Sequence, residues 1–107
     1  MKVSMLVLAG AAMLAAGAAQ ASDDDAKKLL QKSGCTACHS EDKKLVGPAY
    51  KDVAAKYKGD AAAAGKLAEK VKKGGSGVWG PVPMPPNVNV KDDDIKTMVA
   101  YVLALKK

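Results

Sequence analysis

Two cysteines and the chain's one histidine stand together in Cys35-Thr36-Ala37-Cys38-His39. If this segment forms a helical turn, the thiols of Cys35 and Cys38 project from one side of it. The imidazole of His39 follows directly and can bind a metal held beside the thiols. This C-x-x-C-H spacing is the attachment signature for c-type haem, in which both thiols bond the macrocycle and the histidine binds its iron. The segment therefore predicts one covalently bound haem c per chain.

Three other uses of this segment compete with haem attachment. A structural zinc site needs four nitrogen or sulfur ligands, but the whole chain offers two Cys and one His. A thioredoxin-like redox pair belongs in a βαβ context, of which the sequence has no sign, and it leaves His39 without a role. A disulfide between Cys35 and Cys38 is feasible in an oxidising compartment, yet so small a loop adds little stability. Haem attachment accounts for all three residues and is favoured.

The composition fits a cofactor at the centre of the domain. The 107 residues are 49% hydrophobic but only 4% aromatic, and none is Phe. A flat apolar macrocycle can occupy the middle of a domain too small to build such a core itself. The 26% charged residues exclude a disordered or collagen-like chain. All 17 basic residues are Lys, so nucleic acid, which favours the Arg fork, is not expected as a partner.

A second axial ligand for the iron has to come from another part of the chain, because there is no second His. Met, Tyr or no residue at all remain open. Apart from the N-terminal segment, the chain contains two methionines. Met98 falls on the apolar stripe of a predicted helix and is interpreted as a core residue. Met84 stands between Pro83 and Pro85, which restrict the backbone and can hold its side chain in one direction, so Met84 is the preferred candidate.

The hydrophobic pattern is helical, with no alternating strand pattern and no internal repeat, so the expected fold class is all-α. The predicted helices are Asp23–Lys32, Ala61–Lys73 and Asp92–Leu105, with a weaker helical turn at Val53–Tyr57. Ser22 or Asp23 is expected to cap the first helix. Lys91 cannot accept a hydrogen bond from helix amides, so Asn89 or Asp92 is expected to cap the last one.

The N-terminus is typical of a secretory signal peptide. A positive start at Met1-Lys2 is followed by the apolar run Val3 to Ala19 and by Ala19-Gln20-Ala21. This order predicts cleavage after Ala21 and export to the periplasm. The apolar run is short and rich in Ala and Gly, so we expect no stable membrane insertion after cleavage. The predicted domains are a cleaved signal peptide, 1–21, and a haem domain, 22–107.

Three segments give the haem domain a family resemblance. They are Gly34 to His39, Val46 to Tyr57 and Gly77 to Asn87. With them, the chain resembles a small bacterial class I cytochrome c of the monohaem c-551/c-552 type. The resemblance implies about four short helices wrapped around one covalently attached haem. It also implies a monomeric periplasmic electron carrier, not an enzyme, that shuttles single electrons between respiratory redox proteins.

The resemblance implies a ligand set as well. His39 and Met84 become the two axial ligands of the iron, and the Pro48 carbonyl accepts the other ring N–H of His39. Such a bond fixes the tautomer and the orientation of a ligating imidazole.

Three further residues receive a role in the same way. Lys70 and Trp79 are expected near a haem propionate, and the side chain of Asn87 is expected to donate to the Met84 sulfur. Relatives often have Arg at the position of Lys70 and Trp at that of Tyr101. A point charge therefore replaces a bidentate clamp on the propionate.

The expected partners are redox proteins such as a terminal reductase, a cytochrome c peroxidase or an oxidase. An apolar docking edge is expected at Pro81, Val82, Pro83 and Pro85. Candidate charges around it are Lys43, Lys44, Lys51, Lys56 and Lys72. A haem enzyme or gas sensor with an open iron position is the opposing class of function, although the chain has no spare His or Arg for distal acid–base chemistry. A copper chaperone that uses Cys35, Cys38 and Met84 is a third.

Overall fold

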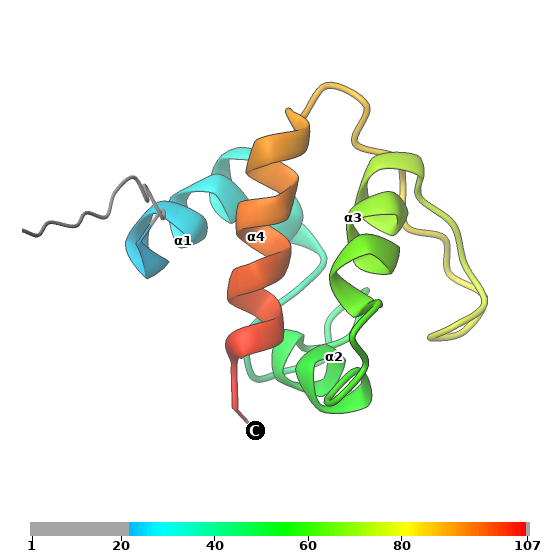
Figure 1. The fold of residues 1–107 in the computed structure, drawn as a ribbon. Helices are drawn as coiled ribbons and strands as arrows, with labels where there is room; N and C mark the ends of the chain where they lie inside the picture. The colour runs from blue at the N-terminus through cyan, green and yellow to red at the C-terminus, as the bar shows by residue number, and fades with distance from the viewer. Residues whose placement is uncertain (1–21, 107) are drawn as a thin grey trace, which may run out of the picture.

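The computed structural model describes residues 22–106, so the predicted signal peptide lies outside the described residues. The elements are α1 (Asp23–Lys32), the 3-10 turn η1 (Cys35–Ala37), α2 (Tyr50–Lys56), α3 (Ala63–Lys73) and α4 (Asp92–Ala104) (Figure 1). Within residues 22–106 the β pairing is limited to two isolated bridges, His39 with Lys44 and Gly75 with Met84. The predicted all-α class is confirmed. No helix in this part of the chain is long and apolar enough to cross a membrane.

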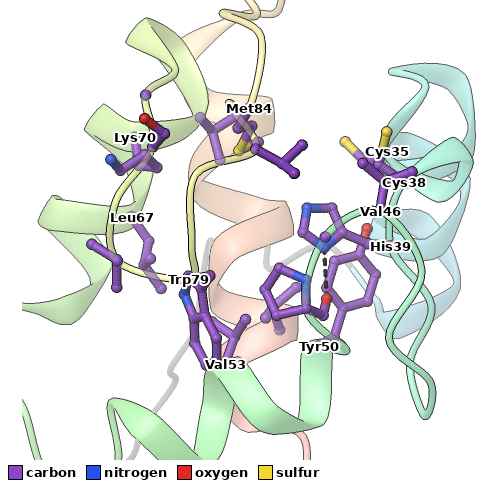
Figure 2. A pocket seen from close by; sticks show the side chains of 18 of the residues that line it. Cys35, Cys38, His39, Val46, Tyr50, Val53, Leu67, Lys70, Trp79 and Met84 are labelled. Atoms are coloured by element: carbon purple, nitrogen blue, oxygen red, sulfur yellow. Dashed lines mark hydrogen bonds between the residues drawn. The ribbon is translucent and has the colours of Figure 1, made fainter.

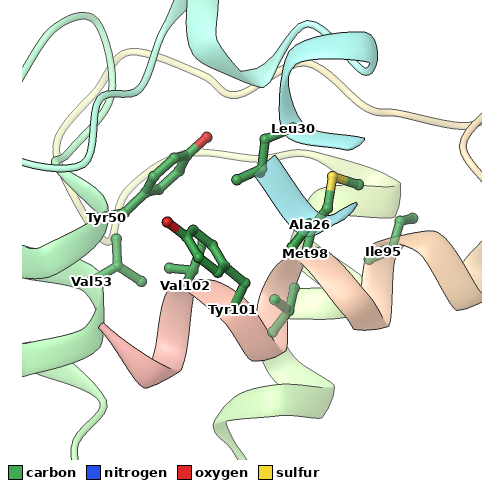
Figure 3. Packing of buried hydrophobic residues seen from close by; sticks show 9 residues of the cluster. Ala26, Leu30, Tyr50, Val53, Ile95, Met98, Tyr101 and Val102 are labelled. Carbon is green, nitrogen blue, oxygen red and sulfur yellow. The ribbon is translucent and has the colours of Figure 1, made fainter. Parts of the chain in front are cut away.

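Helix α4 is the centre of the packing. It contacts α1, α2 and α3, which surround it in Figure 1. Its buried stripe consists of Ile95, Met98, Val99, Tyr101 and Val102. Leu30 of α1 and Val53 of α2 belong to the same cluster (Figure 3). Met98 is only 3% exposed, as expected for a core residue.

Local hydrogen bonds determine where α1 and α3 begin. Ser22 caps α1: its hydroxyl accepts the Asp25 N–H at 3.1 Å, and the Asp25 carboxylate accepts the Ser22 N–H at 3.2 Å. Helix α3 begins two residues later than predicted, because Ala61 and Ala62 form a turn. In that turn the Asp60 carboxylate accepts the Ala62 N–H at 2.8 Å.

Helices α2 and α4 depart from the expected boundaries. Helix α2 starts at Tyr50, three residues earlier than predicted, after an extended Ala49. The expected cap of α4 by Asn89 or Asp92 is wrong. Lys91 itself is the N-cap residue, and no side chain caps the helix. The three acids of the first turn instead place negative charge where the helix dipole favours it.

A hydrogen bond between distant segments ties α4 to the loop that follows the cysteine motif. The hydroxyl of Tyr101 donates to Oε2 of Glu41 at 2.6 Å, across 60 positions of sequence. Burial, and after it the Glu41 carboxylate, raises the pKa of Tyr101 to about 12. The phenol is therefore protonated near neutral pH.

Tyr101→Phe should lower the free energy of unfolding by about 1 to 2 kcal/mol near neutral pH, because a hydrogen bond to a charged acceptor is lost. The raised pKa adds a pH dependence: the contribution of the phenol is complete below pH 10.0 and is lost as the pH rises through about 12. Denaturant titrations across that window should show a shallower loss of stability for Tyr101→Phe. Equal slopes for the two proteins would contradict this account.

Candidate haem-binding site

A cavity of about 350 Å³ gathers most of the residues predicted to form the site. This volume lies in the range of small-molecule sites. The predicted residues that line it are Cys35, Cys38, His39, Pro48, Lys70, Trp79 and Met84 (Figure 2). Much of the remaining wall is aliphatic, formed by Leu30, Val53, Leu67, Val71, Val99 and Val102.

The two cysteines lie on one wall of this cavity. Gly34 has φ +79°, a left-handed conformation that turns the chain from α1 into η1. The Cys35 carbonyl then accepts the N–H groups of Cys38 at 3.2 Å and His39 at 3.0 Å. The two thiols are not joined in a disulfide, and both cysteines border the cavity (Figure 2). Burial raises the pKa of the Cys35 thiol.

The ring of His39 is oriented by its neighbours. Its Nδ1–H donates to the Pro48 carbonyl at 2.7 Å, so Nε2 has the free lone pair and faces the cavity (Figure 2). The ring of Tyr50 stacks on it, with 5.1 Å between centroids and 22° between planes. A Cβ on Gly47 would lie 2.5 Å from Cε1 of His39, so only glycine fits there.

Tyr50 and Gly47 were not among the predicted site residues. Tyr50 is 6% exposed, and burial is the main cause that raises the pKa of its phenol. The signal in the sequence is the Gly47-Pro48 pair, which places a residue without a side chain directly before the carbonyl that His39 needs.

Met84 lies across the cavity from His39 (Figure 2). Its N–H donates to the Gly75 carbonyl at 2.8 Å, and its carbonyl accepts the Gly75 N–H at 3.0 Å. At Gly74, φ is +74°, and a Cβ there would lie 2.5 Å from the Met84 oxygen. The backbone of Met84 is thus fixed against the end of α3. Met98 also borders the cavity, but from the core stripe of α4.

Lys70 and Trp79 both border the cavity, as expected, from α3 and from the loop after it. Trp79 is 43% exposed. The Nζ of Lys56 lies 5.6 Å from the centroid of its ring, a cation–π distance.

Asn87 is the predicted site residue that does not border the cavity. Its Nδ2 donates to the Val71 carbonyl at 3.0 Å and to the Pro85 carbonyl at 3.3 Å. These two bonds occupy both hydrogens of the amide. These are the bonds that the Asn87 amide makes in the described residues, and the expected bond to the Met84 sulfur stays a prediction. Asn87 ties the segment after Met84 to α3.

The residues present fit a haem of the c type. Two adjacent thiols and an imidazole Nε2 lie on one side of an aliphatic cavity, with a thioether across from them. Within residues 22–106, no group of three or more His, Cys, Asp or Glu side chains could hold a metal ion by itself. The zinc alternative therefore gains no support.

A small helical domain with this arrangement of donors belongs to the class of covalent haem proteins. The family model described as cytochrome c matches residues 24–106. Cytochrome c-551 of Allochromatium vinosum is 62% identical over 77 residues, which cover 72% of this chain and 82% of the relative. Cytochrome c-552 of Nitrosomonas europaea is 52% identical over 107 residues, 99% of this chain and 100% of the relative.

The crystal structure of wild-type Nitrosomonas europaea cytochrome c552 matches with a TM-score of 0.72 and 54% identity, covering 75% of this chain and 99% of that one. The chain belongs to the cytochrome c family. It has the class I cytochrome c fold and a covalently bound haem c, and it is a monohaem electron carrier. The predicted family, fold and cofactor are confirmed.

Gly47→Ala should lower the free energy of unfolding of the haem protein by about 1 to 3 kcal/mol, because the added methyl group forces the His39 ring to move. Gly65→Ala is the matched control: in α3 a Cβ at this position meets nothing within 4 Å. It should be neutral or stabilising by up to about 1 kcal/mol. Denaturant titration measures both variants, and NMR of the His39 ring reports its displacement. A Gly47→Ala protein as stable as the parent would contradict the close approach.

Proposed function

We propose that this protein is a periplasmic carrier that shuttles single electrons between respiratory redox proteins through a haem c with His39 and Met84 as axial ligands. The observation that supports this most is the pair of donors across one cavity, each fixed by its backbone surroundings. His39 is oriented by the Pro48 carbonyl at 2.7 Å, and Met84 is bonded to Gly75 at 2.8 and 3.0 Å. When bound, the haem supplies a one-electron couple at its iron, and His/Met ligation raises the potential.

The remaining site residues receive their roles within this proposal. Cys35 and Cys38 bond the macrocycle, and Pro48 keeps His39 in the tautomer that leaves Nε2 free. Lys70 offers a positive charge and Trp79 an indole N–H to a haem propionate. All of these residues border the cavity.

A rigid donor pair suits electron transfer better than catalysis or sensing. An enzyme or a gas sensor needs an open iron position, and peroxidase-type chemistry also needs an acid–base group beside it. The wall opposite His39 is formed by Met84 between Pro83 and Pro85, and the chain has no second His and no Arg. The carrier is therefore preferred, and no catalytic residue is assigned.

Export with cleavage after Ala21 completes the proposal. Cytochromes of the c-551 and c-552 type are generally periplasmic. The full Nitrosomonas europaea sequence is matched by 99% of this chain, whereas its crystallised form is matched by 75% of it. The crystallised relative therefore lacks a segment comparable in length to residues 1–21. We place the haem domain at 22–107.

Met84→Ala should leave the haem attached through Cys35 and Cys38 but remove the thioether absorption band of the oxidised protein and lower its reduction potential. Met98→Leu is the control, because a volume-conserving core swap should change mainly stability, by less than about 1.5 kcal/mol. Visible spectra and potentiometry of the exported proteins measure these effects. Loss of the thioether band in Met98→Leu alone would overturn the ligand assignment.

Mass spectrometry of the exported parent protein should show an N-terminus at Ser22 and one haem on the peptide with Cys35 and Cys38.

The docking surface is proposed around the mouth of the cavity, where apolar side chains are exposed. Val46 is 56% exposed and Val82 is 59% exposed, and both border the cavity. Lys43 and Lys44 are exposed as well and lie close to Val46 in the sequence. A small apolar patch with a basic rim suits brief encounters with an acidic partner surface.

Val82→Glu should slow electron exchange with a periplasmic reductase, peroxidase or oxidase by about tenfold, since a charge at the apolar contact costs on the order of 1.4 kcal/mol. Val88→Glu is the matched control, because Val88 is 64% exposed but does not border the cavity. Stopped-flow rates should also fall as the ionic strength passes about 0.1 M, where the Debye length is about 10 Å. If the protein exchanged electrons with none of these partners and instead turned over a small substrate, the proposed carrier function would be wrong.

A further inference from the structure

The segment 85–91 connects the cavity to the start of α4. In Figure 1 this segment starts beside α3 and crosses to the start of α4. Its beginning is bonded to α3, because the Asn87 N–H donates to the carbonyls of Val71 at 3.1 Å and Lys72 at 3.2 Å. Within the segment, the Val90 N–H donates to the Asn87 carbonyl at 3.2 Å. The position of Met84 therefore depends on how firmly this segment is held on α3.

Lys72 holds the far end of the same segment. Its Nζ donates to the Val90 carbonyl at 2.8 Å and lies 3.2 Å from Oδ1 of Asp92. Its side chain is 35% exposed, whereas that of the neighbouring Lys73 is 72% exposed. Lys72 was expected among the charges around the docking edge. Its ammonium instead interacts with the Val90 carbonyl and the Asp92 carboxylate of the same molecule.

We propose that Lys72 is a positioning residue that keeps Met84 on the haem iron by fastening segment 85–91 to α3. The inference rests on the proposed ligation by Met84. A flexible stem with three N–H donors can serve the Val90 carbonyl and the Asp92 carboxylate together. Asp92 is also held from its own side, because it lies in the first turn of α4, where the helix dipole favours a carboxylate. Lys72 thus connects two helices across the end of the segment.

The Lys72 contacts favour the closed arrangement of segment 85–91, with Met84 on the iron, over an open arrangement in which Met84 has left it. Movement of the segment that follows Met84 lets its side chain leave the iron, and contacts made only in the closed arrangement oppose that movement. Removing the Lys72 contacts should raise the population of the open arrangement. An external ligand that competes with Met84 then binds more tightly by the same factor.

Imidazole binding to the oxidised haem protein tests this bias. In Lys72→Leu the apparent affinity for imidazole should rise about tenfold, the factor that corresponds to the loss of one hydrogen bond from a charged donor. Lys73→Leu is the matched control, because the Lys73 ammonium lies 3.8 Å from Glu69 of the same helix at an exposed position. Its affinity should stay within about twofold of the parent.

Two further variants separate positioning from general stability. Lys72→Arg keeps a donor within reach of Val90 and should restore most of the parent affinity. Asp92→Asn removes the charge but leaves the bond to Val90, so an intermediate increase is expected. Denaturant titrations accompany each measurement. A Lys72→Leu protein that is less stable but binds imidazole like the parent would overturn the inference, and so would equal increases in Lys72→Leu and Lys73→Leu. A parent protein without the thioether band would overturn the Met84 assignment itself, which is a separate result.

Discussion

Burial of the aliphatic stripe of α4 is the interaction on which the rest of the structure depends. Ile95, the first residue of this stripe, is 2% exposed, and α1, α2 and α3 all contact α4. Each of those helices adjoins one part of the site: α1 leads into the turn with the two thiols, α2 follows Pro48, and α3 ends just before Gly75, which bonds Met84. Because burial of apolar surface is the dominant favourable term in folding, packing on α4 sets the relative positions of the donors.

The parts of the fold that local chemistry determines could be predicted from the sequence. The range of α1 follows from Ser22 and the acids after it, and the end of α3 follows from Gly74. The cysteine motif indicated the cofactor because its residue types and spacing have few other uses. Met84 was found as a candidate because the prolines beside it restrict the backbone.

The parts that depend on contacts between distant segments could not be predicted in the same way. Lys91 is the N-cap of α4 although its side chain caps nothing, and the residue before it is bonded to a distant helix, because the Lys72 ammonium donates to the Val90 carbonyl. The amide of Asn87 bonds carbonyl oxygens of α3 and of its own loop, which become available only once the loop lies there. Gly47 is required by the ring of a residue eight positions earlier, a packing constraint that becomes visible only once the loop brings the two together.

Counts of lysine likewise overstate the charge available for docking. Of the five lysines expected around the edge, three interact within the molecule: Lys51 with Asp42 at 2.5 Å, Lys56 with the Trp79 ring, and Lys72 with Asp92. The ammonium groups of Lys51 and Lys72 contribute less field at a distance than isolated ones, since their carboxylate partners have the opposite sign. The Trp79 ring has no net charge, so it orients Lys56 without cancelling its field. The attraction toward an acidic partner therefore comes from a smaller set of residues than the five expected lysines.

The cavity wall with His39 and the cavity wall with Met84 are stabilised by different kinds of interaction. This difference decides which of the two walls moves away from the haem more easily. The His39 wall contains the two cysteines and the stacked, buried Tyr50, and the loop after the cysteines is tied to α4 by the bond from Tyr101 to Glu41. The Met84 wall consists of backbone bonds to Gly75 and of a loop whose prolines are exposed. Exposed loop hydrogen bonds open at lower free energy than bonds within a packed core. If His39 and Met84 are the ligands, as proposed, loss of a ligand should therefore begin on the methionine side, where the fold depends on a few polar contacts with the end of α3.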